Sequence, residues 1–424
     1  MLDMHFIREN SEAVKKGCRA KNTQTDIDHL LVLDEEKRSL LVQVEEKKHE
    51  RNSASKEIGV LKREGKDAGD ILDKMKKLSD EIKEADEIVV SRGKEIYEIM
   101  IRIPNLPHES TPVGKDASFN KEIMSWGEKR TFDFKPKPHD EIGENLDILD
   151  IKRASKITGS GYALFKGAGA LLERALINLM IDVHVEDHGF KEIAPPFIVN
   201  RKSMFGTGQI PKMEEDMYDL EDKKFFLIPT AEVPVTNIHR DEILQEDKLP
   251  VRYVAYTPCF RREAGSYGKD TSGITRVHQF DKVELVKFVK PEDSYKEHEE
   301  LLKCSEKILK ILKLPYRVLL LASGDISFAA AKCYDIEVWS PGLDRYLEVS
   351  SCSNFEDFQA RRANIRFKRK SKNKTEFVHT LNSSGVALPR TFIAILENYQ
   401  NEDGSVTIPD ALIPYMRGMK RIEK

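Results

Sequence analysis

A seven-residue repeat of apolar side chains across residues 26–102 limits the fold of this chain more than any other feature of its sequence. The segment contains no proline and is dense in Lys, Glu, Asp and Arg. Apolar residues at the a and d positions of several successive heptads are typical of a coiled coil. These positions hold Leu33, Leu40, Val44, Ala54, Ile58 and Leu61, and later Ile71, Met75, Leu78, Ile82, Ala85, Val89, Ile96 and Ile99.

The repeat is interrupted once, at residues 62–70, where the sequence reads KREGKDAGD. Two helices joined by so short a break are expected to fold back antiparallel on each other. At about 1.5 Å per residue, each helix would be about 50–55 Å long. The sequence therefore predicts a helical arm over about residues 27–100.

The repeat alone leaves the purpose of this arm open, because an oligomerisation or spacer coiled coil would show the same pattern. Lys47, Arg51 and Arg92, however, occupy seam positions where apolar residues are expected. They leave cations on a slender surface, which favours contact with a large partner. Contacts from Lys and Arg to a nucleic-acid backbone suit recognition of a helical RNA by its shape.

Residues 254–261 and 279–286 indicate the two strands of a hairpin, since the second alternates like a half-buried strand. Segment 265–273 between them is rich in Gly, Ser, Lys and Asp, as is typical of a mobile loop. The hairpin would hold Arg261, Arg276, Glu263 and Glu284 at fixed spacing, with the face of Phe280 available to a planar ring. Planar guanidinium groups bind phosphate oxygens in bidentate fashion. A hairpin with surface ion pairs is the alternative.

The wording of this segment, FRREAG followed by HQFDKVELV, resembles motif 2 of the class II aminoacyl-tRNA synthetases and is similar to the seryl subfamily in particular. The resemblance extends from MLDMHFIREN at the start to PDALIPYM near the end. It implies an α+β fold, with an antiparallel sheet flanked by helices. The implied catalytic domain, with motifs 1, 2 and 3, covers residues 104–424, and the arm belongs to a tRNA-binding domain of residues 1–103.

Residues 168–188 carry apolar side chains at helical spacing, and an extended segment with Pro195 and Pro196 follows at residues 193–199. A double proline fits a sheet edge, where main-chain donors need not all be paired. An ordinary core helix and edge strand would look the same. The resemblance identifies this segment as motif 1 and implies a homodimer.

Thr230, Ala231 and Glu232 follow the short apolar strand FFLIP. A hydroxyl and a carboxylate at a strand end can bind the hydroxyl and the ammonium of a small amino acid. A helix N-cap by Thr230, with Glu232 in the first turn, is the alternative. The triplet TAE is the signature of the seryl subfamily, so the resemblance favours serine binding.

Two segments near the C-terminal end complete the implied site. RYLEVSSCS contains Glu348, Ser350 and Ser351, whose oxygens suit Mg²⁺ bridged to phosphate, although a solvated loop would look the same. HTLNSSGVALPRTF predicts a strand followed by a helix over residues 389–399, with Pro389 in its first turn. This resembles motif 3 and its arginine, Arg390. The subfamily wording is closer to GLAVGRT, so Leu388 and Pro389 are a departure.

The resemblance implies a role for each of these residues. Serine would be bound by Thr230, Ala231, Glu232, Arg261, Glu284 and Ser384. ATP would be bound by Arg261, Arg262, Glu263, Arg276, Val277, Phe280, Glu348, Val349, Ser350, Ser351 and Arg390. Glu348 and Ser351 would position Mg²⁺, and Lys47, Arg51 and Arg92 of the arm would contact tRNA. The implied substrates are serine, ATP and tRNA(Ser), and also tRNA(Sec).

Charge and composition limit the partners and the cellular location that we expect. The net charge of −3 gives no global attraction to nucleic acid, so RNA contacts must come from local basic patches such as residues 361–373. That basic run also suits a charged strand and a solvated hairpin loop.

The five cysteines are scattered, form no CxxC pair and indicate reduced thiols. With no membrane-spanning run and no targeting segment, we expect a cytoplasmic protein.

Three other functions are compatible with parts of this sequence. A different class II synthetase would need its own anticodon-binding domain, and the chain ends soon after motif 3. A ligase that aminoacylates a carrier protein would be expected to lack the arm. A catalytically inactive relative acting as a binding protein would be expected to have lost Arg261, Glu284 or Arg390, all of which are present.

Overall fold

The computed structural model describes residues 1–263, 273–371 and 374–424. The chain divides into two compact units. The smaller unit comprises residues 2–19 and 23–104, and the larger comprises residue 1, residues 20–22 and residues 105–424. Most of the loop predicted at residues 265–273, and the end of the basic run at residues 372–373, lie outside the described residues.

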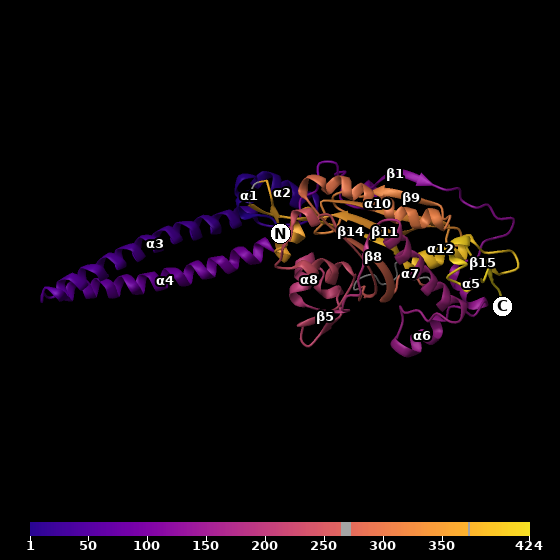
Figure 1. Cartoon of the computed structure of the whole chain (residues 1–424), viewed down its shortest axis with the longest axis horizontal. Coiled ribbons are helices and arrows are strands. Elements are labelled where there is room, and N and C mark those ends of the chain that lie inside the picture. The colour runs from indigo at the N-terminus through magenta and orange to yellow at the C-terminus, as the bar shows by residue number, and fades with distance from the viewer. Residues whose placement is uncertain (264–272, 372–373) are drawn as a thin grey trace. The chain divides into compact units, whose positions relative to one another are not determined.

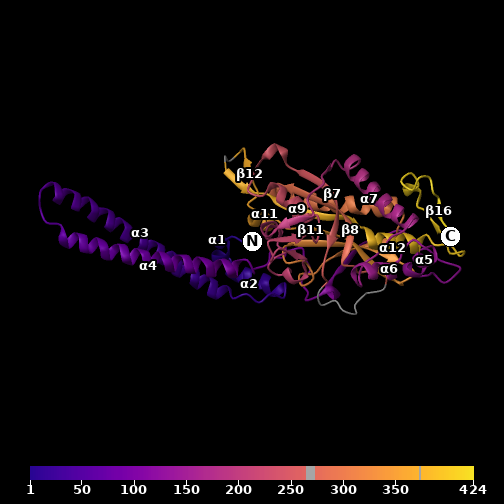
Figure 2. The same ribbon diagram turned by 90° about the horizontal axis from the view of Figure 1, so that it is seen from below.

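Two long helices dominate the smaller unit. After α1 (Met4–Glu9) and α2 (Ser11–Ala20), α3 runs over Ile27–Arg63 and α4 over Gly69–Met100. The two long helices pack side by side and run antiparallel, as Figures 1 and 2 show. The predicted helix pair and its short break are confirmed. Asp26 fixes the start of α3, because its side chain accepts a hydrogen bond from the backbone N–H of His29.

Apolar heptad residues are buried between α3 and α4, among them Val44, Ala54, Ile58, Leu78 and Ile82. Polar residues take over part of the same seam. Lys47 pairs with Glu81 of α4 at 2.9 Å, and Arg92 of α4 pairs with Glu36 of α3 at 2.9 Å. Such half-exposed ion pairs contribute about 0–1 kcal/mol each to stability. Their main effect is therefore on the register of the two helices.

An eight-stranded sheet forms the centre of the larger unit, in the order β1-β9-β10-β11-β14-β8-β7-β2. Every neighbouring pair is antiparallel except β2 and β7, which are parallel. The sheet confirms the predicted α+β fold. Its strands are β1 (Lys121–Trp126), β2 (Lys191–Glu192), β7 (Val251–Phe260), β8 (Gln279–Val289), β9 (Tyr316–Leu320), β10 (Lys332–Ser340), β11 (Arg345–Asn354) and β14 (His379–Ala387).

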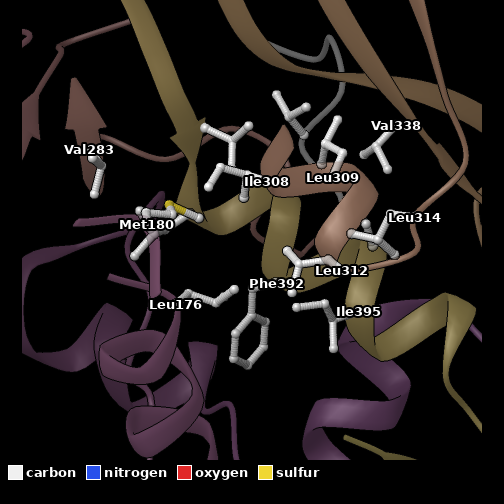
Figure 3. Close-up of a cluster of buried hydrophobic side chains, with 14 of the residues drawn as sticks. Leu176, Met180, Val283, Ile308, Leu309, Leu312, Leu314, Val338, Phe392 and Ile395 are labelled. Carbon is white, nitrogen blue, oxygen red and sulfur yellow. The ribbon is translucent and has the colours of Figure 1, made fainter. Parts of the chain in front are cut away.

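Three helices bury their apolar sides in one core against this sheet: α7 (Ala168–Glu186), α10 (Ser294–Ile311) and α12 (Leu388–Asn398). Figure 3 shows side chains of all three helices meeting, with Leu176 of α7, Ile308 of α10 and Phe392 of α12 in the cluster. Val283 of β8 and Val338 of β10 contribute from the sheet. These helices therefore hold in place the strands that carry the candidate site.

The remaining elements surround the sheet. Two small three-stranded sheets have the orders β3-β5-β4 and β13-β12-β6, and β15 pairs with β16. Their strands are β3 (Ile198–Asn200), β4 (Asp219–Leu220), β5 (Phe225–Leu227), β6 (Ile243–Gln245), β12 (Arg366–Arg369), β13 (Lys374–Phe377), β15 (Val406–Thr407) and β16 (Arg421–Ile422). The short helices are α5 (His139–Asn145), α6 (Ile151–Thr158), α8 (Arg201–Thr207), α9 (Glu232–Thr236) and α11 (Phe358–Ala363). Short 3₁₀ turns are η1 (Ala117–Phe119), η2 (Glu214–Asp216), η3 (Asn237–His239), η4 (Glu246–Lys248), η5 (Pro291–Asp293) and η6 (Asp410–Leu412).

The expectation of one extended segment over residues 193–199 is wrong. Lys191–Glu192 forms β2 at the edge of the large sheet, whereas Ile198–Asn200 forms β3 in a separate sheet. Pro195 and Pro196 lie between the two strands. Because proline has no backbone N–H to donate, the chain leaves one sheet there and joins the other. Among the described residues, no helix is both long enough and apolar enough to cross a membrane.

Glu173 on α7 provides a test of this packing. Its side chain is buried, and neither carboxylate oxygen has a hydrogen-bond partner in the described part of the chain. Burial, with a smaller contribution from Asp281, raises the pKa of Glu173 to about 8. The protonated form therefore stabilises the fold at acidic pH, and this stability is lost as the pH rises through about 8.

We expect Glu173→Gln to remove this loss, because the amide stays neutral at every pH. The melting temperature of the variant should rise relative to that of the unmodified protein between pH 6 and pH 9. Differential scanning calorimetry across this range measures the difference. Melting temperatures that stay a constant distance apart at all pH values would contradict the assignment.

Candidate active site

A cavity of about 200 Å³ opens where the β7–β8 hairpin meets β11, β14 and the start of α12. Most of the predicted ATP-binding residues line it. Its lining residues are Arg261, Glu263, Ile274, Thr275, Arg276, Val277, Phe280, Lys282, Glu348, Val349, Ser351, Ser384, Ala387, Pro389 and Arg390. Arg262 and Ser350 do not line the cavity: Arg262 is exposed, and Ser350 is buried with its hydroxyl on the Ser384 carbonyl at 2.8 Å.

Two β-bulges bring residues of opposite strand phase into this cavity. On β11 the register shifts between Ser350 and Glu348, so that Val349 is the extra residue. Successive residues of a regular strand point to opposite faces, so Glu348 and Ser351, three positions apart, would point away from each other. The bulge restores their shared direction, because one extra residue changes the phase of the strand.

The second bulge lies on β14, where the register shifts between Ser384 and Val386 and leaves Gly385 as the extra residue. Ser384 and Ala387 therefore both reach the cavity. A Cβ atom at Gly385 would come within 2.9 Å of His184 Nε2 and 3.0 Å of Val283. Only glycine allows so close an approach of β14 to α7 and β8.

Three arginines face the cavity, and hydrogen bonds to the backbone hold two of them. Arg261 Nε donates to the Pro229 carbonyl at 3.2 Å, and Arg390 bonds the carbonyls of Thr275 at 3.2 Å and Glu348 at 2.7 Å. Arg276 forms an ion pair with Glu263 at 3.3 Å. Guanidinium groups fixed in this way suit an extended phosphate chain, because ordering them costs no further entropy.

Leu388 and Pro389, the departure from the motif 3 wording, leave the arginine in place. Leu388 is fully buried and starts α12, and Pro389 lies in the first turn, where a missing N–H costs no helical hydrogen bond. Arg390 follows directly and lines the cavity.

Phe280 forms one wall of the cavity, and the Arg261 guanidinium carbon lies 5.2 Å from the centre of its ring. Phe280, Lys282 and Glu284 alternate along β8, so their side chains point to the same face of the strand. Phe280 and Lys282 line the cavity, and Glu284 follows them on the same face of the strand without lining it.

His139 holds the described end of the motif 2 loop. The ring Nε2 accepts a hydrogen bond from the backbone N–H of Ile274 at 3.1 Å, and Nδ1 lies 3.1 Å from Glu397. Gly273 has a φ of +60°, and a Cβ atom there would come within 2.0 Å of His139 Nε2. Glycine at this position therefore satisfies both the backbone conformation and the contact.

Of the predicted serine-binding residues, Arg261 and Ser384 line the cavity, whereas Thr230, Ala231, Glu232 and Glu284 do not. These four residues are buried, and Lys282 of the cavity wall contacts Glu284 and Thr230. Thr230, Glu232 and Glu284 are all less than a tenth exposed. The Thr230 hydroxyl lies 3.4 Å from Glu284 Oε2 and accepts from Lys282 Nζ at 2.9 Å. It also accepts from the Glu232 backbone N–H at 3.2 Å, although the N-cap residue of α9 is Ala231 and not Thr230. Ala231 is fully buried, and Ser384 pairs with Glu284 across the strands.

Glu232 has an unusual environment. Gln359 of α11 donates to its Oε1 at 2.6 Å, while Thr380 in turn donates to the Gln359 oxygen at 2.7 Å. Burial, together with Glu284 nearby, raises the pKa of Glu232 to about 7. Near neutral pH the Glu232 carboxyl is therefore partly protonated and partly ionised, and an incoming ammonium group would favour the ionised form.

The residues expected to position Mg²⁺ fit a hard cation. Glu348 contributes a half-exposed carboxylate whose Oε2 lies 3.4 Å from Arg390, and Ser351 contributes a hydroxyl on the same cavity wall. Magnesium prefers oxygen ligands and keeps several waters when it bridges to phosphates. Two protein oxygens at an open position meet that preference.

Sequence reasoning missed several residues of this site, among them Lys282, His139 and Gln359. Lys282 could have been found, because the alternation that places Phe280 and Glu284 on one face of β8 includes it. His139 and Gln359 lie on α5 and α11, far from the motifs in sequence, and no spacing pointed to them.

Three cations of the basic run at residues 361–373 form ion pairs with acids. Arg369 pairs with Glu376 at 2.7 Å and with Glu292 at 2.8 Å, and Lys370 pairs with Asp247 at 3.0 Å. Arg361 pairs with Asp357 at 2.7 Å. These contacts favour a structural role for the described part of the run.

Known proteins share both the arm and the cavity-bearing unit. Residues 213–399 match the tRNA synthetase class II core domain (G, H, P, S and T), and residues 1–107 match the seryl-tRNA synthetase N-terminal domain. The serine–tRNA ligase of Carboxydothermus hydrogenoformans is 58% identical over 424 residues, covering 100% of both chains. That of Caldicellulosiruptor saccharolyticus is 58% identical over 416 residues, covering 98% of this chain and 99% of the other.

Comparison with solved structures gives the same result as comparison of sequences. Seryl-tRNA synthetase from Pyrococcus horikoshii, complexed with ATP, superposes with a TM-score of 0.94 at 39% identity and covers 100% of this chain and 99% of its own. The cytoplasmic serine–tRNA ligase from Naegleria fowleri, in complex with AMP, gives a TM-score of 0.90 at 29% identity, with the same coverage. By sequence over its full length and by fold, the chain belongs to the seryl-tRNA synthetase family of class II.

Proposed function

We infer that the chain is a serine–tRNA ligase: it activates serine with ATP to seryl-adenylate and pyrophosphate, and transfers serine to the 3′ end of tRNA(Ser). One observation carries this function. A cavity lined by three arginines and an aromatic wall reaches Lys282, whose ammonium contacts Glu284 and Thr230 in a buried polar cluster suited to a small polar amino acid. The full-length relatives catalyse the reaction that their names state.

In the first step the serine carboxylate attacks the α-phosphorus in line, and pyrophosphate leaves. This step needs alignment and charge neutralisation more than a general base. Arg261 is suited to hold the α-phosphate and the serine carboxylate, because its guanidinium faces the cavity while Nε stays on the Pro229 carbonyl. Arg276 and Arg390 would bind the γ-phosphate end.

We propose that adenine lies between Phe280 and Arg390, both of which line the cavity. An aromatic face and a guanidinium plane can stack on the two sides of a base. Glu263 and the main chain at Val277 would meet the polar edge of adenine. The Pyrococcus horikoshii relative was solved in complex with ATP, which supports a nucleotide as the ligand of this family.

Glu348 and Ser351 are the residues that would hold Mg²⁺. When bound, the ion supplies positive charge at the β- and γ-phosphate oxygens. Glu348 also accepts the Arg390 guanidinium on its main-chain carbonyl, so it orients a phosphate-binding arginine as well.

The serine end is proposed to select its substrate by polar contact. Buried carboxyls that bond the serine hydroxyl and ammonium would be left unpaired by alanine, and unpaired buried polar groups are costly. Thr230, Ala231 and Glu232 would form one side of this end, and Glu284 and Ser384 the other. Threonine would be excluded by crowding at its additional methyl group.

We propose that residues 1–103 form a tRNA-binding domain and residues 104–424 the catalytic domain. The arm would contact the long variable arm of tRNA(Ser), and tRNA(Sec) by the same shape. Arg51 is the remaining seam cation of the three candidates, since Lys47 and Arg92 pair with acids of the opposite helix. A contact by either of these two would have to share the cation with that acid.

A homodimer and a cytoplasmic location complete the proposal. Phe197, Ile198, Leu220 and Phe225 are each more than a third exposed around β3, β4 and β5, next to the motif 1 segment. Adjacent exposed apolar side chains of this kind mark interaction surfaces. All five cysteines are free thiols, which fits a reducing compartment.

ATP–pyrophosphate exchange tests the activity. Exchange should depend on serine and should be at least about 100-fold weaker with alanine, because discrimination by hydrogen bonding to a hydroxyl is strong. Threonine should also fail. Exchange supported equally by another amino acid, with none above background for serine, would overturn the function.

Phe280→Ala should raise the KM for ATP by about tenfold, because stacking on a base is worth roughly 1–3 kcal/mol. The KM for serine should change little. Phe280→Tyr retains the aromatic face and serves as the matched control. Equal changes in both KM values for the alanine variant, or ATP binding that the tyrosine variant fails to retain, would contradict the proposed adenine position.

Shortening the arm separates the two steps. Lys47 and Glu81 face each other across the helix pair, so residues 48–80 can be replaced by a short Gly-Ser turn that joins two neighbouring chain ends. Serine-dependent exchange should persist, while aminoacylation of tRNA(Ser) should be lost. If the shortened protein charged tRNA as well as the full chain does, the arm would not be the tRNA-binding element.

A further inference from the structure

Lys282 lies between the cavity and the buried cluster of Thr230, Glu232 and Glu284. It follows Phe280 and precedes Glu284 on the same face of β8, and it lines the cavity although its side chain is only 8% exposed. Its Nζ lies 2.6 Å from Glu284 Oε2 and 2.9 Å from Thr230 Oγ1. A buried ammonium in contact with two of the proposed serine-binding residues calls for a role of its own.

The hydrogen bonds of Thr230 show what Lys282 controls. A threonine hydroxyl has one proton to donate and two lone pairs to accept with. Its lone pairs receive Lys282 Nζ and the Glu232 backbone N–H, so its proton is directed to Glu284 Oε2 at 3.4 Å. Lys282 therefore fixes the direction in which the Thr230 hydroxyl donates.

The charges around Glu232 and Glu284 also indicate a role for Lys282. Glu232 and Glu284 are both buried, and two nearby carboxyls cannot both ionise without a cation. Lys282 is in direct contact with Glu284, while Glu232 is hydrogen-bonded by the neutral Gln359. Cys259 of β7 and Arg261 are the other titratable or charged groups that face this pair.

We propose that Lys282 is a positioning and specificity-determining residue of the amino-acid end: it holds the Glu284 carboxylate in place as the acceptor for the serine hydroxyl and ammonium. The inference rests on the proposed serine–tRNA ligase activity and adds a residue to it. Glu232 is left as the carboxyl that changes protonation when serine enters. Lys282 thus divides two similar acids into two different roles.

The chain provides a matched control in Lys287, which lies on the same strand. Its side chain is 3% exposed, and Nζ pairs with Glu297 at 2.9 Å, but Lys287 does not line the cavity. Because 282 and 287 differ by an odd number, the two lysines lie on opposite faces of β8. Methionine at either position removes a buried charge and keeps the length of the side chain.

Lys282→Met should raise the KM for serine by about 10- to 100-fold in ATP–pyrophosphate exchange, because it removes hydrogen bonds to a charged group. The KM for ATP should stay within about twofold, and the preference for serine over alanine should fall. Lys287→Met should lower stability and change none of these three quantities.

A double-mutant cycle with Glu284→Gln covers the case in which Lys282→Met does not fold, because the double variant leaves no uncompensated charge. Lys282→Met should lower kcat/KM for serine by less than about threefold in the Glu284→Gln background. An equal loss in both backgrounds, or a Lys282→Met variant that behaves like Lys287→Met, would overturn the inference. Absence of serine-dependent exchange in the unmodified protein would instead overturn the proposed function.

Discussion

The antiparallel pairing of β7 with β8 is the constraint on which the rest of the site depends. Its register runs unbroken from Val251 opposite Phe288 to Phe260 opposite Gln279. Because the pleat repeats every two residues, this register places Phe280, Lys282 and Glu284 on one face, and a slip of one residue would turn all three away. The core of α7, α10 and α12 holds that register, since Val283 and Leu285 of β8 are buried in it.

The opposite wall of the cavity is built by breaking regularity. Bulges at Val349 and Gly385 bring Glu348 with Ser351, and Ser384 with Ala387, to one side. The β8 side of the site thus has regular strand pleating, whereas the β11 and β14 side depends on bulges. A rigid sheet of this kind suits a reaction whose barrier is lowered by alignment and fixed charge, because few groups then need to reorganise when the substrates arrive.

The sequence predicted the elements whose periodicity is regular. The heptads of α3 and α4, the alternation of β8 and the helical spacing of α7 all gave nearly the observed bounds. Two kinds of feature escaped. Seam cations such as Lys47 and Arg92 suggested a surface for a partner, but each forms an ion pair with an acid on the other helix. The heptad repeat of a single helix does not reveal such a pair. Contacts such as Glu232 with Gln359 join elements far apart in sequence, so no local pattern carries them.

The central claim is that one rigid face of β8 presents an aromatic wall, an ammonium and a carboxylate to a nucleotide joined to a small hydroxylated amino acid. A crystal structure with a non-hydrolysable seryl-adenylate analogue tests it most directly. We expect adenine against Phe280, the phosphate analogue on Arg261, and the seryl group beside Glu284 with Lys282 still in contact with that carboxylate. Density for the analogue outside this cavity, or a seryl group remote from Glu284, would contradict the account.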